Sequence, residues 1–219
     1  PDPAAWSANI SSRCGADHDG VVKAVDMLLS AEKPVIVVGQ GVRYGGAANE
    51  LLALAERLQI PVASSASGLG AIPVQHPLSL GLVQRGGTYQ SNHACRQADV
   101  LLALGVRFDD RTSSSWIPGY SFTIPPTRLI HVDIDPEEIG RNYPVALGLM
   151  ADVRTFLRQV LAELDRRGHS GEPTAASRKW LAAIDGYRAE WNAFTAPGYS
   201  DDSSPINPQR AAVEIDKAL

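Results

Sequence analysis

The sequence contains little cysteine, no long apolar run and no excess of positive charge, and each of these absences excludes a class of protein. Only Cys14 and Cys95 occur among 219 residues, which excludes a four-cysteine zinc site and favours a reduced, cytoplasmic setting. No apolar stretch approaches the roughly 18 residues that a membrane-spanning helix requires. We therefore expect a cytoplasmic protein without a membrane span.

The charge balance and the first residues are equally plain. With 20 Lys and Arg residues against 24 Asp and Glu residues, the net charge is −4, so we expect no surface for nucleic acid or for a membrane. The chain opens with Pro1 rather than Met and without the pattern of a signal peptide, so we expect a piece of a longer chain. What the sequence does have is 44% hydrophobic residues, enough for a buried core.

Short apolar runs rich in valine and isoleucine alternate with amphipathic stretches. Such runs are typical of strands buried on both faces, and strand, turn, helix and strand in succession require a parallel sheet. The pattern predicts an α/β fold, a Rossmann-like doubly wound parallel sheet. The expected strands cover residues 34–38, 60–63, 100–104, 128–134 and 147–150. The expected helices are 19–29 capped by Asp19, one helix after Gly41 that ends near Leu58, 91–98, and one capped by Asp152.

The same pattern divides the chain into three parts. Residues 1–18 have no periodicity, which indicates an arm or linker. Residues 19–167 carry the predicted sheet and form a central domain of the nucleotide-binding type. Residues 168–219 contain a polar stretch, an expected helix over 177–194 and a last helix from Pro208. We expect this third part to be a linker and the start of a following domain that the chain lacks.

Two glycines, Gly39 and Gly41, stand where the first expected strand gives way to a helix. Glycine lets the backbone approach a phosphate there, and a helix N-terminus favours an anion. The dinucleotide fingerprint is incomplete because Tyr44 occupies the position of its third glycine. Two interpretations stay open, a phosphate-binding turn and a tight turn that binds nothing.

Charged residues follow directly after the expected strand 100–104. Ligands of open α/β sheets lie beyond the carboxyl ends of the strands, which places Gly105, Arg107 and Arg111 where a ligand would bind. The two arginines are suited to clamping phosphates through paired hydrogen bonds. The alternative is a surface ion-pair cluster that joins this loop to a neighbour.

Two aspartates stand at the end of the strand 128–134. Asp133 is a candidate for contact with a ribose or an adenine amine. Asp135 is followed by Pro136 and two glutamates, so its expected role is to cap a helix. The hypothesis of a ligand contact therefore rests on Asp133.

No catalytic residue and no metal ligand is predicted. The 5 histidines are scattered, without an acid and a nucleophile in a recognisable arrangement. The run Ser113–Ser115 lacks the context of a nucleophile elbow and is predicted to be a flexible loop. Cys95, in an expected helix, is predicted to be a small core residue rather than a reactive thiol.

Several segments together carry a family resemblance, and the run Gly-Val-Arg-Phe-Asp-Asp-Arg at 105–111 is the most specific of them. Residues 19–164 resemble the central domain of thiamine-diphosphate enzymes of the acetolactate synthase type. The tail from Ile206 to Arg210 is similar to the segment that leads into the next domain of such enzymes. The other segments that carry the resemblance are 33–41, 60–62, 68–70, 76–77, 98–100 and 132–136.

The resemblance implies a three-domain parent, with a pyrimidine-binding domain before this chain and a diphosphate-binding domain after it as its partners. The residues for thiamine diphosphate and magnesium belong to those two domains, and no Gly-Asp-Gly motif occurs here. The parent is expected to be a homo-oligomeric transferase or lyase that decarboxylates or joins 2-oxo acids. The chain alone is expected to lack that activity.

The resemblance also implies a nucleotide site, because the central domain of acetolactate synthases binds FAD in a structural role without redox chemistry. This chain has Gln84–Gly87 where those synthases carry Gly-Met-His-Gly, and some relatives bind ADP or nothing there. FAD and ADP therefore both stay open. The candidate contacts by motif position are Gly39, Gly41, Ser65, Gly105, Arg107, Arg111, Asp133 and Asp152.

Two other functions stay open at this point. One is a free-standing nucleotide-binding module of the electron-transfer flavoprotein type, which shares this fold. The other is a structural domain whose site has decayed. Residues 205–219 argue against the module, because a self-contained domain has no need of an unfinished entry into another one.

Overall fold

A six-stranded parallel sheet forms the centre of the computed structural model, which describes residues 13–218. The strand order is β3-β2-β1-β4-β5-β6, and every neighbouring pair is parallel. This order is that of a dinucleotide-binding doubly wound fold, so the predicted α/β class is confirmed. The strands are β1 Pro34–Val38, β2 Val62–Ser64, β3 Ser79–Leu82, β4 Val100–Leu104, β5 Arg128–Asp133 and β6 Leu147–Met150.

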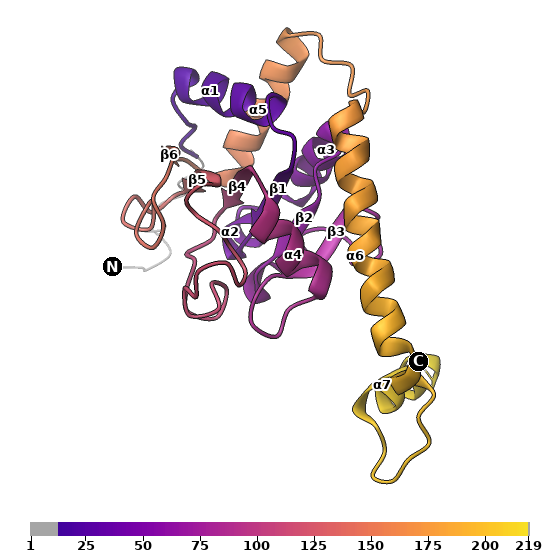
Figure 1. The fold of residues 1–219 in the computed structure, drawn as a ribbon. Coiled ribbons are helices and arrows are strands. Elements are labelled where there is room, and N and C mark those ends of the chain that lie inside the picture. Colours follow the sequence, from indigo (N-terminus) through magenta and orange to yellow (C-terminus); the bar gives the residue numbers. More distant parts are fainter. Residues whose placement is uncertain (1–12, 219) are drawn as a thin grey trace, which may run out of the picture.

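Helices cover both faces of the sheet (Figure 1). Residues of α1, α3 and α5 share one core cluster with the sheet, and residues of α4 and α6 share the other. None of the described helices combines the length and the apolar character needed to cross a membrane. The helices are α1 His18–Leu29, α2 Gln40–Tyr44, α3 Ala48–Leu58, α4 Tyr89–Gln97, α5 Val153–Arg166, α6 Ala175–Tyr199 and α7 Pro208–Ala218, with a short 3₁₀ turn η2 at Ala66–Gly68.

The two central strands are buried on both faces, as their apolar runs predict. All five residues of β1 and all five of β4 are buried. Successive side chains alternate between the two cores, with Ile36 and Val38 on the α1–α3–α5 face and Val35 and Val37 on the other. Each such side chain contributes roughly 1.5–3 kcal/mol by its burial. This rigid centre fixes where the loops after β1 and β4 emerge.

Three local predictions are wrong in detail. Asp17, not Asp19, caps α1, and its carboxylate accepts hydrogen bonds from the amides of Asp19 and Gly20. The single helix expected after Gly41 is two helices, because Gly46 has a φ of +62° and breaks the run. β3 was not expected, since its sequence Ser-Leu-Gly-Leu has no β-branched residue.

The segment Ser113–Ser115 has no regular secondary structure, but it is not the flexible loop that the sequence predicts. Ser113 and Ser114 are buried. The Ser113 hydroxyl donates to the carbonyl of Phe108 at 2.9 Å, and the hydroxyls of Ser114 and Ser121 are 2.7 Å apart. These internal bonds satisfy the serines and fix the loop. Cys95 is fully buried in α4, which confirms it as a core residue.

Helix α6 is longer than predicted and begins against the domain. Its Trp180 is 3% exposed, and the indole Nε1 donates to the carbonyl of Pro34 at 3.1 Å. Further along, α6 extends beyond the sheet toward α7, in which no residue is buried (Figure 1). The predicted arm over residues 1–18 lies mostly outside the described residues.

Candidate functional site

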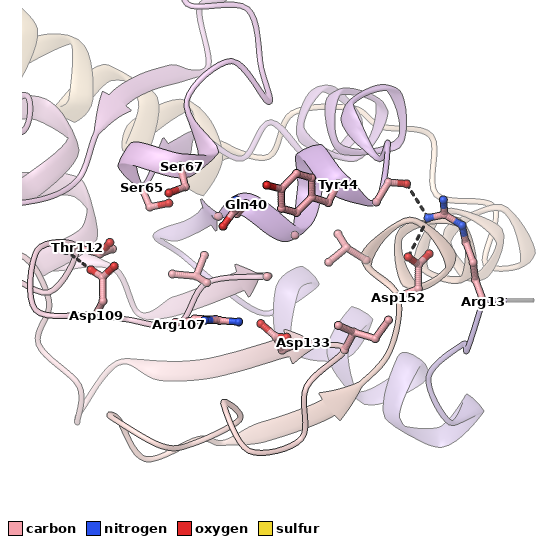
Figure 2. Close-up of a pocket in the computed structure, with 17 residues that line it drawn as sticks. Arg13, Gln40, Tyr44, Ser65, Ser67, Arg107, Asp109, Thr112, Asp133 and Asp152 are labelled. Atoms are coloured by element: carbon pink, nitrogen blue, oxygen red, sulfur yellow. Dashed lines mark hydrogen bonds and ion pairs between the residues drawn. The ribbon is translucent and has the colours of Figure 1, made fainter. Parts of the chain in front are cut away.

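A cavity of about 360 Å³ opens at the carboxyl edge of the sheet, where the loops after β1, β4 and β5 meet. The strand order reverses between β1 and β4, and this is the place where doubly wound sheets bind ligands. We call it the switch-point cavity. Figure 2 shows its lining, to which seven of the eight sequence-predicted residues belong. Those seven are Gly39, Gly41, Ser65, Gly105, Arg107, Asp133 and Asp152.

Three glycines hold the loops after β1 and β4 in direct contact. A Cβ on Gly39 would overlap the carbonyl oxygen of Gly105, and one on Gly41 would lie 2.8 Å from the Cα of Gly105. The amide of Gly39 donates to Leu104 O at 3.0 Å, and that of Gly41 donates to Gly105 O at 3.3 Å. These amides are therefore engaged within the protein. The glycines keep side chains off the floor of the cavity but leave phosphate binding to other groups.

Arg107 and Asp133 bring opposite charges to one wall of the cavity (Figure 2). The Arg107 side chain is 71% exposed, and its Nε lies 3.7 Å from the buried Glu138 carboxylate. Asp133 is 8% exposed and accepts a hydrogen bond from the amide of Asp135 at 3.0 Å through Oδ1. The long ion-pair distance leaves the guanidinium able to turn toward an anion.

Asp152 closes the far end of the cavity together with Arg13 (Figure 2). Asp152 Oδ1 accepts from the amide of Thr155 at 3.0 Å, which confirms it as the cap of α5. Its Oδ2 lies 2.9 Å from Nη1 of Arg13, which also donates to the carbonyl of Gly45 at 2.7 Å. Both carboxylate oxygens are thus engaged within the protein. Asp152 positions Arg13 at the rim.

Arg13 and five other polar residues of the lining were missed by sequence reasoning. Arg13 stands in a stretch without periodicity, and nothing in the sequence connects it to α5, 139 positions away. Ser67 stands on η2 beside the predicted Ser65, and Asp109 lies within the recognised run 105–111, where its Oδ1 accepts from the amide of Thr112 at 2.7 Å. The other three are Gln40, Tyr44 and Thr112.

Arg111 does not line the switch-point cavity, so the structure does not bring the two predicted arginines together in one cavity. It borders a neighbouring cavity of about 270 Å³ with Gln84, Arg85, Gly86 and Asp110. The loop after Arg107 turns at Phe108, which has a φ of +50°, and carries Arg111 away. Within residues 13–218 Asp109, Asp110 and Arg111 form no ion pair, whereas Arg107 pairs with Glu138 of the next loop at 3.7 Å. The alternative of an ion-pair cluster is therefore met by Arg107 and not by the other three residues.

Asp135 is outside the cavity, and its predicted role needs one correction. Its Oδ1 accepts a hydrogen bond from the amide of Glu137 at 3.0 Å. The segment that follows is a turn rather than a helix. Pro136 and the glutamates predicted a helix start, but Gly140, with a φ of +76°, ends the segment before a helix forms.

A buried histidine lies beneath the wall that carries Arg107 and Asp133. His131, on β5, is 2% exposed. Its Nε2 lies 2.8 Å from the carbonyl of Val106, and the amide of Gly140 donates to its Nδ1 at 3.4 Å. Burial lowers the pKa of His131, while the Val106 carbonyl and the charges of Asp133 and Glu138 oppose that shift. The neutral ring with its proton on Nε2 therefore ties two loops of the cavity together.

Comparison with known proteins identifies relatives of this chain. Residues 21–160 match the family model described as "Thiamine pyrophosphate enzyme, central domain". A probable acetolactate synthase large subunit from Methanocaldococcus jannaschii is 36% identical over 91% of this chain and 32% of its own length. A probable acetolactate synthase large subunit from Methanococcus aeolicus is 33% identical over 89% of this chain and 32% of its own length. Acetolactate synthase isozyme 3 large subunit from Escherichia coli is 34% identical over 94% of this chain and 35% of its own length.

The relatives are longer than this chain. The chain spans about a third of the length of these curated relatives. The family match covers the strands from β1 to β6 and most of α5. It therefore includes every element that contributes to the switch-point cavity except the segment that bears Arg13.

Proposed function

This chain belongs to the thiamine pyrophosphate enzymes as a central domain of the acetolactate synthase type, and from that premise we propose that it is the nucleotide-binding domain of a larger enzyme. The proposed parent decarboxylates and joins 2-oxo acids with thiamine diphosphate and magnesium held by its other two domains, and acts as a homo-oligomer. The chain contributes no catalytic residue of its own. Its role is to bind a nucleotide and to hold the two neighbouring domains in place.

The proposed layout keeps the three parts expected from the sequence, with an arm over 1–18, a central domain over 19–167 and a connection over 168–219. The burial of Trp180 supports adding the first half of α6 to the central domain. The second half of α6 and α7 then form the approach to the following domain. The exposure of Phe194, Ile206 and Ile215 supports that assignment, since apolar groups left by one domain are available to the next.

The single observation that carries the nucleotide proposal is the position of the cavity at the reversal of strand order. Its size lies within the range of roughly 300–1,000 Å³ typical of ligand pockets. Its residues fit the ADP half that ADP and FAD share. Arg107 and Arg13 would hold the diphosphate, and Asp133 would accept hydrogen bonds from ribose hydroxyls. The side-chain-free floor at Gly39 and Gly105 supports close approach of the ligand.

FAD bound in this domain would supply structural stability and no electron transfer to the parent's reaction. The residues of this chain hold two cationic side chains in place around the cavity. The Arg13–Asp152 pair ties the N-terminal segment to α5 and keeps a cation at one end of the cavity. Glu138 keeps Arg107 at the opposite wall. The two cations therefore face the cavity from elements that are far apart in the chain.

Calorimetric titration of the chain with ADP and with FAD tests the proposal. We expect saturable binding of ADP, and Arg107→Gln should weaken it about tenfold, the effect of one charge-assisted hydrogen bond of roughly 1.4 kcal/mol. Arg111→Gln removes the same charge from the neighbouring cavity and should leave ADP affinity unchanged. Equal ADP affinity in the wild type and both variants, or no binding of either nucleotide, would contradict the proposal.

A further inference from the structure

A third cavity, of about 320 Å³, lies beside α4 and shares no residue with the switch-point cavity. It is bordered by α4, by the turn at Arg85 and Gly87, by Tyr120, and by Trp191 of α6. Helices α4 and α6 run side by side on this face of the sheet (Figure 1). We call this space the aromatic cavity. None of the residues proposed to hold the nucleotide lines it, although Arg85 and Gly87 belong to the segment 84–87 that the family resemblance relates to the flavin site.

Aromatic rings form one wall of the aromatic cavity. The rings of Tyr89 and Trp191 are stacked, with centroids 5.7 Å apart and an interplanar angle of 10°. The imidazole of His93 lies 4.0 Å from the Tyr89 ring, centroid to centroid. Trp191 and Tyr120 stay 37% and 40% exposed, so part of their apolar surface is open to a ligand. A wall of this kind favours a flat, apolar group.

Cationic groups lie beside the aromatic rings. Arg85 and Arg96 both line the cavity, and no Asp or Glu is among its lining residues in the described part of the chain. Arg96 Nη2 lies 3.0 Å from His93, and Arg85 donates to the Ser115 hydroxyl. Neither arginine forms an ion pair within residues 13–218, whereas Arg13 and Arg107 of the switch-point cavity both do. The Glu190 carboxylate raises the pKa of Tyr89 but does not line the cavity.

Aromatic rings next to guanidinium groups that have no ion-pair partner in the described residues are suited to one class of ligand. Guanidinium groups bind carboxylates and phosphates through paired hydrogen bonds, and aromatic rings stack on planar groups. The amide of Asn92, also in the lining, donates to the Gln84 carbonyl at 2.9 Å and fixes the turn that carries Arg85. We propose that the aromatic cavity binds a small anion with an aromatic ring, either an aryl carboxylate or a nucleoside monophosphate.

The test is a titration of the 219-residue chain with benzoate, with AMP and with cyclohexanecarboxylate, followed by calorimetry. Benzoate or AMP should bind, and cyclohexanecarboxylate, which has the same charge without an aromatic ring, should bind at least about fivefold more weakly. Tighter binding of benzoate identifies an aromatic acid as the ligand. Tighter binding of AMP identifies a nucleotide when Arg96→Gln weakens it and Arg107→Gln does not, because AMP also fits the proposed nucleotide site in the switch-point cavity. Binding of all three with equal affinity, or of none, would overturn the proposal.

Variants locate the binding. Arg96→Gln should weaken binding of the preferred probe about tenfold, and Trp191→Leu about threefold. Arg178→Gln, which removes the same charge from an exposed position on α6, the helix that carries Trp191, is the control and should bind as the wild type does. Circular dichroism at the titration temperature verifies that each variant is folded. Unchanged affinity in folded Arg96→Gln would show that the probe binds elsewhere.

Discussion

The switch-point cavity and the aromatic cavity differ in what builds them. The first is formed by backbone at the ends of parallel strands, and its glycines exclude side chains from the floor. The second is formed by side chains of two helices and two loops that meet only because α6 packs on α4. Loss of one helix contact should therefore abolish the second cavity and spare the first. A change in the strand-end loops should do the reverse.

The largest effect is expected from Trp180→Ala, which removes the side chain that anchors α6. Loss of a buried tryptophan costs roughly 3–5 kcal/mol, and the bond to Pro34 is lost as well. Binding to the aromatic cavity should be lost, and ADP affinity should be retained in the folded fraction. Urea unfolding and the two titrations measure this. Trp180→Phe keeps most of the packing, so it should retain both ADP binding and ligand binding at the aromatic cavity. Loss of ADP binding in folded Trp180→Ala would break the comparison.

Gly39→Ala should act on the other cavity. The new Cβ would overlap the carbonyl of Gly105, so the loops after β1 and β4 must separate, at a cost of roughly 2–3 kcal/mol. ADP binding should fall sharply while benzoate or AMP binding at the aromatic cavity persists. Gly46→Ala is the control, since it has a φ of +62° but no atom near its Cβ, and should cost only about 1 kcal/mol. Equal unfolding free energies for the two variants would disprove the tight loop contact.

The pH dependence of the unfolding free energy tests whether His131 is buried as a neutral ring beneath the cavity wall that carries Arg107 and Asp133. Because burial lowers its pKa in the folded state, the unfolded chain binds the proton more readily. Stability contributed by the neutral ring is present above the unfolded pKa of about 6.5 and is lost as the pH falls below it. The slope is at most about 1.4 kcal/mol per pH unit for one proton.

Replacing His131 by Gln should reduce the fall in unfolding free energy between pH 7 and pH 5. Part of this fall should remain in the variant, because burial also lowers the pKa of His93. Identical curves for wild type and His131→Gln would mean that His131 does not titrate differently in the two states.

The smallest effect is expected at Asp135, which touches neither cavity. Asp135→Asn leaves an oxygen able to accept from the Glu137 amide, so the cost should be at most about 1 kcal/mol, with unchanged ADP affinity. Urea unfolding and calorimetry measure both values. A large loss of ADP affinity would place Asp135 in the nucleotide site and would contradict its assignment outside the switch-point cavity.

What the sequence predicts follows the same division. The sheet and the edge that carries Gly39, Gly105 and Asp133 could be predicted, because buried strands leave continuous apolar runs and their ends mark the ligand edge. Arg13 and the separation of Arg107 from Arg111 could not, because they depend on a contact across 139 positions and on the positive φ of Phe108. The aromatic cavity was missed because it depends on where a helix predicted at 177–194 docks.

The most direct measurement of the central claim is an NMR titration of the labelled chain with ADP. If the switch-point cavity is the nucleotide site, the amide signals that shift most should be those of Gly39, Gly41, Gly105 and Arg107, with Asp133 on the facing strand end. The signals of Tyr89 and Arg96 should stay in place. Shifts confined to the aromatic cavity, or no shifts at millimolar ADP, would contradict the account.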